Sequence, residues 1–347
     1  GQMSKLDELI AELCPDGVHY VSVGDLCSIQ TGSQINKETL KDVGEYPVYN
    51  GGINPSGYTD DFNTEANTIA ISQGGANAGF VNWVDVPFFA GAHCYTIKNV
   101  SKLILNRYLY FYLKNKQDDI QNSKHGAGIP GLNSRAIKNL RIPVPPLPVQ
   151  QEIVRILDNF TELTTQLTAE LKAEIEARKK QYEYYRDWLL SQEGLNKLCP
   201  DGVEYKELSH VLKIKNGRDY KDFADGEIPV YGSGGVMTYI DRCVYDKPSV
   251  LIPRKGSIGN LYYVDTPFWT VDTIFYTEIN TCVIEPKFVY YYLQTQHLER
   301  LNTAGGVPSL TQAVLNKVVI PVPPLPVQQK IVRILDNFTE LIAQLET

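Results

Sequence analysis

The sequence repeats itself, and this repeat constrains the fold more than any other feature. Residues 142–163 read IPVPPLPVQQEIVRILDNFTEL, and residues 320–341 match them except for Glu152 against Lys330, at an offset of 178. A second motif, LCPDGV, begins at Leu13 and again at Leu198. Self-similarity of this kind marks duplicated structural units. The 347 residues are therefore expected to form two related globular parts and two related connectors.

Between these anchors the similarity is weak but in register, as in Pro47-Val48-Tyr49 against Pro229-Val230-Tyr231. We expect an α+β fold: two homologous α/β globular heads separated by long helices that form an antiparallel coiled coil, with an internal pseudo-twofold repeat. The expected parts are an N-terminal helix at 4–13, head 1 at 14–147, a central connector helix at 148–198, head 2 at 199–325 and a C-terminal connector helix at 326–347.

The connectors are predicted to be helices with one apolar seam. The prolines of Pro143–Pro148 require an extended segment, and a helix can begin near Pro148. No proline or glycine interrupts 149–193, which predicts a helix roughly 65 Å long. Apolar residues then follow at alternating steps of three and four, typical of a coiled-coil seam: Ile153, Ile156, Phe160, Leu163 and Leu167, matched by Ile331, Ile334, Phe338, Leu341 and Leu345. Such a helix is either a dimerisation rod or one partner of an antiparallel pair within the chain.

By the repeat, Thr347 corresponds to Ala169, and the N-terminal Leu6, Leu9, Ile10 and Leu13 correspond to the end of the central connector. We therefore expect the N-terminal helix to be the far end of the second connector, as in a circular permutation. The C-terminal connector is then expected to be short, which favours a partial complex or dimerisation through the unpaired seam.

Composition limits the function. The chain is 43% hydrophobic with no apolar run long enough to span a membrane, and its net charge of −7 argues against a generic polycationic nucleic-acid binder. Head 1 carries 12 basic and 14 acidic residues over 1–147, and head 2 the same numbers over 199–323. The six cysteines form no C-x-x-C pair, which fits reduced thiols in a cytoplasmic protein.

The heads combine short strand-like runs, such as Thr68–Ser72 and Val250–Ile252, with one aromatic-rich helix each, at Lys102–Lys114 and Pro286–Gln294. Their loops carry glycine together with amides, hydroxyls and cations, the groups that contact base edges and phosphates. The candidate DNA-binding residues are Tyr49, Asn50, Asn54, Ser72, Gln73, Asn77, Lys124, His125, Asn133 and Arg135 in head 1, and Lys213, Lys215, Arg218, Tyr231, Ser233, Arg254, Lys255, Ser257, Thr311 and Gln312 in head 2.

Matched loops differ between the heads. The amide-rich Ser72-Gln73-Gly74-Gly75-Ala76-Asn77 stands where head 2 has the cationic Pro253-Arg254-Lys255-Gly256-Ser257-Ile258. Two heads that read different base sequences would differ in this way. The alternative is that these are ordinary turns, and that Lys213, Lys215 and Arg218 form a solvated strand edge.

Catalytic motifs are missing. The sequence has no G-x-x-x-x-G-K-[ST] loop, no G-x-G-x-x-G dinucleotide motif and no Asn-Pro-Pro-aromatic motif of an amino-methyltransferase. The five histidines show no H-x-E-x-H or i, i+4 spacing, so we expect no metal site.

Two divergent heads, each ending in G-x-[I/V]-P-x-L and I-P-V-P-P-L-P-x-Q-Q and followed by a long helix, resemble the specificity (S) subunit of type I restriction-modification systems. The resemblance covers nearly the whole chain. It implies that each head is a target recognition domain for one half of a bipartite site in double-stranded DNA. It also implies that the helices set the spacer and that the chain itself binds no cofactor.

The resemblance further implies partners. Two modification subunits would bind S-adenosylmethionine and methylate adenine at N6, and restriction subunits would use ATP and Mg²⁺ to translocate and cut DNA. Six residues at the helix starts are expected to face the modification subunits: Gln150, Gln151, Arg155, Gln328, Gln329 and Arg333.

Two other functions remain open from the sequence. One is a two-headed scaffold on a coiled-coil rod that binds no DNA. The other is a hydrolase with a site assembled from His125 or Asp272. Exchange of residues 206–318 separates these possibilities, since it should change one half-site in a DNA reader and abolish the activity of an enzyme.

Overall fold

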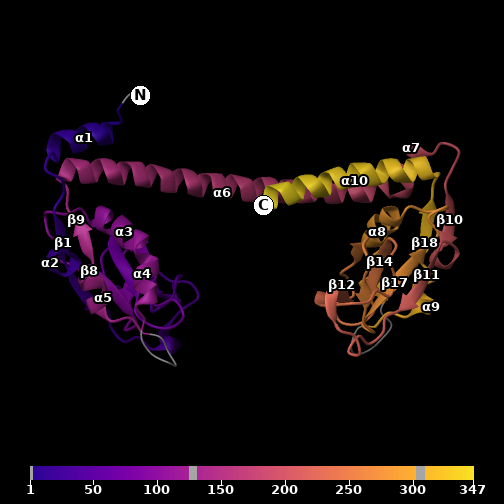
Figure 1. Cartoon of the computed structure of the whole chain (residues 1–347), viewed down its shortest axis with the longest axis horizontal. Coiled ribbons are helices and arrows are strands. Elements are labelled where there is room, and N and C mark those ends of the chain that lie inside the picture. Colours follow the sequence, from indigo (N-terminus) through magenta and orange to yellow (C-terminus); the bar gives the residue numbers. More distant parts are fainter. Residues whose placement is uncertain (1–2, 125–130, 302–308) are drawn as a thin grey trace. The chain divides into compact units, whose positions relative to one another are not determined.

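The computed structural model describes residues 3–124, 131–301 and 309–347 (Figure 1). The chain divides into unit 1 (Gly1–Leu167) and unit 2 (Thr168–Thr347), and the boundary falls within a single helix, α6 (Leu147–Leu189). Each unit holds one head and the connector segments that pack against it.

Head 1 is built around a four-stranded antiparallel sheet in the order β2–β8–β5–β6. A second sheet has the order β4–β3–β7, with β3 and β7 parallel, and β1 pairs with β9 where the head meets the connector. The strands are β1 (Tyr20–Ser22), β2 (Ser28–Thr31), β3 (Tyr46–Tyr49), β4 (Tyr58–Thr59), β5 (Thr68–Ser72), β6 (Val81–Val84), β7 (Phe89–Ala90), β8 (Cys94–Lys98) and β9 (Arg141–Pro143). The helices of unit 1 before α6 are α1 (Lys5–Leu13), α2 (Val23–Leu26), η1 (Lys37–Thr39), α3 (Asn106–Asn115), α4 (Gln117–Asn122) and α5 (Ser134–Lys138).

Head 2 repeats this topology strand for strand. Its sheets have the orders β11–β17–β14–β15 and β13–β12–β16, and β10 pairs with β18. The strands are β10 (Glu204–Glu207), β11 (Leu212–Asn216), β12 (Asp225–Gly232), β13 (Gly235–Ile240), β14 (Ser249–Pro253), β15 (Tyr262–Val264), β16 (Trp269–Thr270), β17 (Ile274–Ile279) and β18 (Val319–Val322). The helices are α7 (Gln192–Leu198), η2 (Leu208–His210), α8 (Pro286–Thr295), η3 (Leu298–Leu301), α9 (Gln312–Leu315) and α10 (Leu325–Glu346). The duplication expected from the sequence is therefore a duplication of fold.

The aromatic-rich helix expected in each head forms and packs on the central sheet. In α3, Leu109 and Leu113 are fully buried and lie one turn apart, so they share the face that contacts β5 and β6. In α8, Phe288 and Val289 are likewise fully buried, and the helix contacts β14 and β15. The strands β5 and β14 are buried along their whole length, as expected for central strands covered on both faces.

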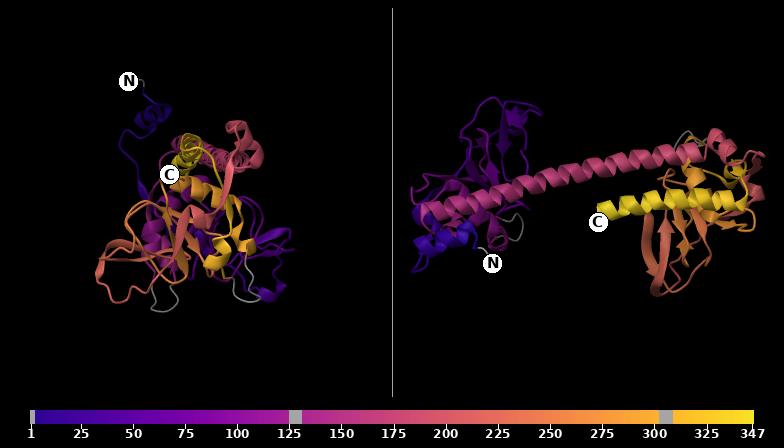
Figure 2. Two further views of the ribbon diagram at one scale, coloured as in Figure 1. Left: turned by 90° about the vertical axis from the view of Figure 1, so that its right-hand side faces the viewer. Right: turned by 90° about the horizontal axis from the view of Figure 1, so that it is seen from above.

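Within unit 2, α10 runs antiparallel to the end of α6 (Figures 1 and 2). The Lys179 Nζ lies 2.6 Å from a Glu346 carboxylate oxygen, and Tyr185 stacks on Phe338 with ring centroids 5.4 Å apart. Residue numbers rise along one helix as they fall along the other, which defines the antiparallel arrangement. Of the two arrangements left open by the sequence, the structure shows the intramolecular antiparallel pair.

The central helix is shorter than the run without proline or glycine suggested. It ends at Leu189, and Ser191 caps a new helix, α7, by accepting a hydrogen bond from the Gly194 amide at 3.1 Å. A Cβ atom at Gly194 would lie 2.0 Å from the Trp188 carbonyl oxygen. The corner therefore depends on Gly194 in the short second helix, one residue beyond the run 149–193 that lacks proline and glycine.

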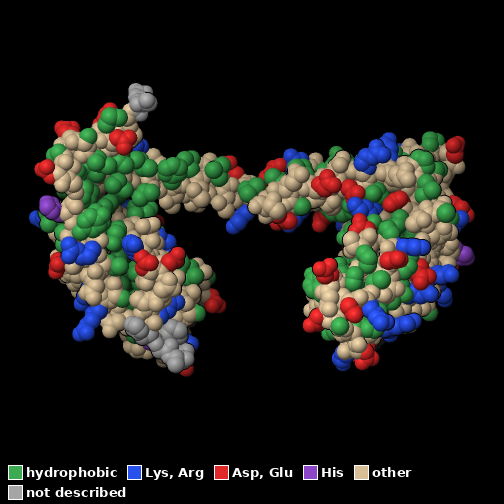
Figure 3. All heavy atoms as spheres, in the orientation of Figure 1, with side chains coloured by type: hydrophobic (Ala, Val, Ile, Leu, Met, Phe, Trp, Pro, Cys, Tyr) green, Lys and Arg blue, Asp and Glu red, His purple; other side chains and the backbone are tan. Residues whose placement is uncertain are grey.

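The repeated seam is more covered in unit 2 than in unit 1. Phe338 of α10 is half-buried and Leu341 is 38% exposed, whereas their counterparts in α6, Phe160 and Leu163, are 64% and 54% exposed. Figure 3 shows hydrophobic side chains following this part of α6. The same sequence is thus placed in two environments within one chain.

Among the described residues, no helix is long and apolar enough to cross a membrane. All six cysteines are free thiols.

Candidate nucleic-acid interface

Four loops of head 1 meet at one place, which we call loop cluster 1: Asn50–Gly51, Ser72–Gly74, His93 and Gly131–Leu132. The His93 amide donates to the Asn50 side-chain oxygen at 2.9 Å, and the His93 carbonyl accepts from the Gln73 amide at 2.8 Å. The Leu132 amide donates to the Gln73 carbonyl, also at 2.8 Å. The loop that carries Gln73 is therefore held from both sides by backbone hydrogen bonds.

Head 2 builds the corresponding loop cluster 2 from Gly232–Ser233, Arg254–Gly256, Asp272–Thr273 and Ser309–Leu310. The Arg254 amide donates to the Thr273 carbonyl at 2.9 Å, and the Leu310 amide donates to the Arg254 carbonyl at 2.8 Å. The Ser233 amide donates to the Thr273 hydroxyl at 3.3 Å. The backbone frame of the two clusters is the same although their side chains differ.

Loop cluster 1 gives its candidate residues different roles. Ser72 is only 4% exposed and its hydroxyl donates to the Gly51 carbonyl at 2.7 Å, so it supports the loop and does not present a free hydroxyl to a base, contrary to our expectation. Lys124 is half-buried and donates from Nζ to the Ala76 carbonyl at 3.1 Å. Asn77 is half-buried and Asn54 is exposed. His125 lies outside the described residues.

Asn133 and Thr311 are matched helix caps. The Asn133 side chain accepts from the Arg135 amide at the start of α5, and the Thr311 hydroxyl accepts from the Val314 amide at the start of α9. Both residues follow directly on the fourth loop of their cluster and remain exposed. Arg135 is also exposed, and the Gln312 side chain donates to the Asn216 side chain at 3.1 Å.

The cations of head 2 fall into two groups. Lys213 and Lys215 lie on β11, with Lys215 Nζ 3.6 Å from a Glu278 carboxylate oxygen, so part of that charge is offset on the sheet face. Lys255 belongs to loop cluster 2, with its Nζ 3.7 Å from an Asp272 oxygen. Arg218 is exposed beyond the end of β11, where its amide donates to the Thr270 carbonyl. The solvated-edge interpretation thus fits Lys213 and Lys215 better than Arg218.

Tyr49 and Tyr231 occupy matched positions at the ends of β3 and β12. Both are half-buried and contact a phenylalanine edge-on, Phe88 and Phe268 respectively. Burial raises the pKa of both phenols, so both hydroxyls stay protonated and able to donate. Ser233 is half-buried in loop cluster 2, and Ser257 is exposed in the loop after β14.

His93 and Thr273 are residues of the loop clusters that were not among the candidates from the sequence. Each supplies the carbonyl that anchors the residue after the central strand. The alignment of the two repeats does match His93 with Thr273, between matched aromatic residues and a buried strand. This match was the sequence signal that could have identified them.

Gln150 and Gln328 have a structural role that corrects our expectation of partner binding. Both are fully buried. Gln150 donates to the carbonyls of Leu103 and Pro145 and accepts from the Leu105 amide at 2.8 Å. Gln328 makes the same bonds in unit 2, to Val283, Pro323 and Glu285. Each glutamine fastens the start of a connector helix to its head.

The other four candidates for partner binding are exposed on the connector helices and remain available to a partner: Gln151, Arg155, Gln329 and Arg333.

The single difference between the repeated segments, Glu152 against Lys330, lies beside these residues. Glu152 is 4% exposed and pairs with Arg155 at 2.6 Å and with Lys5 of α1 at 3.1 Å. The hydrogen bond from Arg155 is the main cause that lowers the pKa of Glu152 to about 2. Its counterpart Lys330 is exposed.

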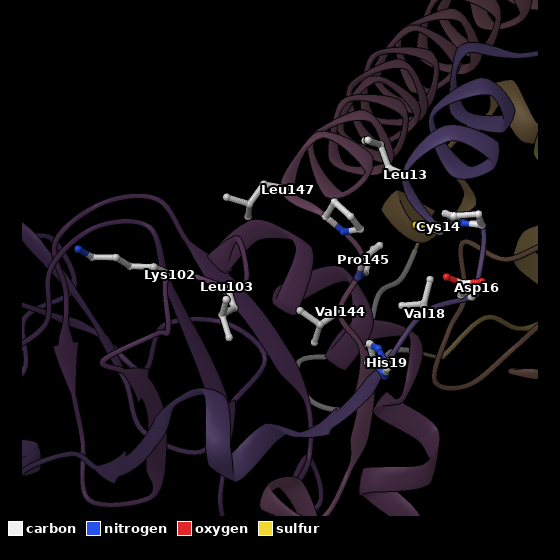
Figure 4. Close-up of a pocket in the computed structure, with 13 residues that line it drawn as sticks. Leu13, Cys14, Asp16, Val18, His19, Lys102, Leu103, Val144, Pro145 and Leu147 are labelled. Atoms are coloured by element: carbon white, nitrogen blue, oxygen red, sulfur yellow. The ribbon is translucent and has the colours of Figure 1, made fainter.

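A cavity of about 410 Å³ lies where α1, the strand into β1 and the segment into α6 meet (Figure 4). It is lined by Cys14, Asp16, His19 and Lys102 among others. Within the described part of the chain, Cys14 and His19 share no side-chain hydrogen bond, and no cluster of three or more His, Cys, Asp or Glu side chains could hold a metal ion. In unit 2 the matched cysteine, Cys199, is buried.

Comparison with known proteins identifies the class. The family model for the type I restriction modification DNA specificity domain matches residues 15–177 and 200–347. A putative type I restriction enzyme specificity subunit of Haemophilus influenzae is 30% identical over 328 residues, covering 88% of this chain and 83% of the relative. A putative type I specificity subunit of Mycoplasma pneumoniae is 28% identical, covering 94% of this chain and 90% of the relative.

Solved structures share the fold. The type I restriction-modification S subunit from M. genitalium gives a TM-score of 0.54 at 24% identity, covering 95% of this chain and 91% of the other. A structure of a type I complex gives a TM-score of 0.61 at 17% identity, covering 95% and 92%.

The chain belongs to the type I restriction-modification DNA specificity family. It is a DNA sequence-recognition subunit, and of the functions left open by the sequence this membership selects DNA recognition over a scaffold that binds no DNA.

Proposed function

We propose that head 1 reads one half of a bipartite site in double-stranded DNA through loop cluster 1, and that head 2 reads the other half through loop cluster 2. The observation that carries this proposal is the pairing of an identical backbone frame with different side chains. Gln73 and Arg254 occupy the same place in that frame, as do His93 and Thr273. Base-edge recognition is set by side-chain donors and acceptors, so such loops discriminate different sequences with one architecture.

The chain acts without a catalytic site of its own. Two modification (methyltransferase) subunits supply S-adenosylmethionine-dependent methylation, and restriction (translocase/nuclease) subunits supply ATP- and Mg²⁺-dependent cleavage. The exposed Gln151 and Arg155, with their matched Gln329 and Arg333, support this docking because the repeat places the same pair on both connector helices. Two related docking surfaces, which differ at Glu152 against Lys330, fit two copies of one partner.

The exposed seam of α6 is the surface for a second copy of this chain. Phe160 and Leu163 line a groove of about 250 Å³ on α6, and Leu167 continues the stripe at 62% exposed. The matched Phe338 packs on Tyr185 of an antiparallel helix in unit 2, so this sequence already accepts such a partner. Two α6 seams packed antiparallel would cover each other in the same manner.

Sedimentation velocity of the chain alone tests this contact. We expect a concentration-dependent dimer that Leu163→Glu converts to monomer, with Glu162→Gln on the polar face as the control. A wild-type chain that stays monomeric at tens of micromolar contradicts it.

Head exchange tests the recognition role. The chain and a version with residues 206–318 replaced by another head are each assembled with the modification subunit and used to select from a random DNA library. We expect two half-sites separated by a fixed spacer, of which only one changes on exchange. Enrichment of a single undivided sequence, or changes in both half-sites, would contradict the assignment of one head to each half.

A further inference from the structure

The residues that follow the central strands, Gln73 after β5 and Arg254 after β14, are equivalent in the two heads. Each amide donates to the carbonyl of the matched residue, His93 or Thr273, at 2.8 and 2.9 Å, and each carbonyl accepts from the leucine of the fourth loop at 2.8 Å. A left-handed glycine follows two positions later in both heads, Gly75 with φ +81° and Gly256 with φ +73°. The two side chains therefore leave the same backbone position.

Both side chains hold polar atoms that are shielded from solvent and unpaired. Within the described part of the chain, the Gln73 Oε1 and the Arg254 Nε have no hydrogen-bond partner. Buried polar atoms without a partner are rare in folded proteins and call for an explanation, of which a missing ligand is one. The guanidinium carbon of Arg254 lies 5.1 Å from the centroid of the Phe275 ring, which holds the planar fork in one orientation.

We infer that Gln73 and Arg254 are the matched specificity-determining residues of the two half-sites, with Gln73 reading adenine and Arg254 reading guanine. This inference rests on the proposed function. A glutamine amide presents a donor beside an acceptor in either orientation, which matches N7 and the N6 amino group of adenine. An arginine fork presents only donors, which match O6 and N7 of guanine.

Three polar side chains next to Gln73 and Arg254 are engaged elsewhere. The Ser72 hydroxyl is bound to Gly51, and the Asn50 side-chain oxygen is bound to the His93 amide. Lys255 next to Arg254 is exposed and near Asp272, a placement that suits contact with phosphate and not a planar fork on a base.

The test uses Arg254→Gln and Gln73→Arg, each assembled with the modification subunit and read by DNA selection and by methylome sequencing. We expect Arg254→Gln to change one base pair of one half-site from G·C towards A·T. Gln73→Arg should make the opposite change in the other half-site. Affinity for the original site should fall on the order of 10- to 100-fold in each case.

Two further variants separate base reading from charge and from folding. Arg254→Lys keeps the charge and a guanine-compatible donor but not the planar fork, so we expect the guanine preference to be weakened while thermal stability is kept. Lys255→Gln should weaken binding about equally for all sequences and reduce its salt dependence.

Unchanged half-sites in complexes of Arg254→Gln, Arg254→Lys and Gln73→Arg would overturn the inference while leaving the recognition role intact. A wild-type complex that selects no bipartite site would instead overturn the proposed function.

Discussion

At the scale of single residues, the most informative side chains are the two buried glutamines. Gln150 and Gln328 each bond two carbonyls and one amide, of which one carbonyl lies in a buried hydrogen bond and the other two groups in partly buried ones. Gln151 and Gln329, one position later, are exposed. In each Gln-Gln pair, the first glutamine therefore attaches the connector helix to its head, and the second is exposed to solvent.

Replacement of Gln150 or Gln328 by alanine is expected to destabilise the chain by about 1–3 kcal/mol, because one buried and two partly buried backbone groups lose their partners. Urea denaturation followed by circular dichroism measures this. Gln151→Ala and Gln329→Ala are the matched controls, with changes within about 0.5 kcal/mol. Equal effects at both positions of a pair would contradict the role assigned to the buried member.

Glu152 is expected to make the attachment of α1 sensitive to acid. Its carboxylate has a pKa of about 2 in the folded chain against 4.5 without partners. The contribution to stability is therefore complete above about pH 4.5 and is lost as the pH falls towards 2. Hydrogen exchange of residues 5–13, corrected for the intrinsic rate at each pH, should show protection that decreases over this window.

Glu152→Gln should have low protection of residues 5–13 at every pH, and Glu162→Gln should behave as wild type. Protection that is independent of pH in the wild type would show that the Lys5–Glu152 contact does not hold α1.

The sequence alone could identify these positions but not their roles. The repeat singled out Gln150 and Gln328, yet a repeated polar residue has the same sequence pattern whether it binds a partner subunit or buried backbone. The two glutamines are buried because the segment before each aromatic-rich helix packs against the connector and places a carbonyl next to the glutamine. This contact joins residues that are far apart in the sequence. In the same way, Ser72 could not be distinguished from an exposed loop serine.

At the scale of elements, the corner between α6 and α7 depends on Gly194. Alanine there would place a Cβ 2.0 Å from the Trp188 carbonyl oxygen. We expect Gly194→Ala to lower the stability of the chain by about 1–3 kcal/mol in thermal or urea unfolding.

Gly234→Ala is the matched control for this corner, since a Cβ at Gly234 meets nothing within 4 Å. Comparable stability of the two variants would mean that the corner tolerates a side chain.

The few elements that the sequence indicated within the heads do form. The runs Thr68–Ser72 and Val250–Ile252 lie in central strands, and the aromatic-rich helices form, although α3 begins at Asn106 and not at Lys102. The end of α6 at Leu189 was not predicted, because a serine cap and a glycine contact with a carbonyl have no periodic signal.

At the scale of the whole molecule, the duplication supports the proposal that one chain recognises two half-sites. The two heads share one topology, so their side chains can differ in the loop clusters without a change of fold. The repeat made this organisation predictable from sequence, whereas the convergence of four loops in each head depends on strand order and was visible only in the structure. His93 and Thr273 were missed for this reason.

Methylome sequencing tests the central claim most directly. A host that lacks type I systems would co-express this chain with its modification subunit, with the modification subunit alone as the control. We expect one new bipartite N6-methyladenine motif, with two half-sites and a fixed unread spacer, that appears only when both proteins are present. A modification complex that forms but produces no motif, or only a single undivided one, would contradict the claim that the two heads read two halves of one DNA site.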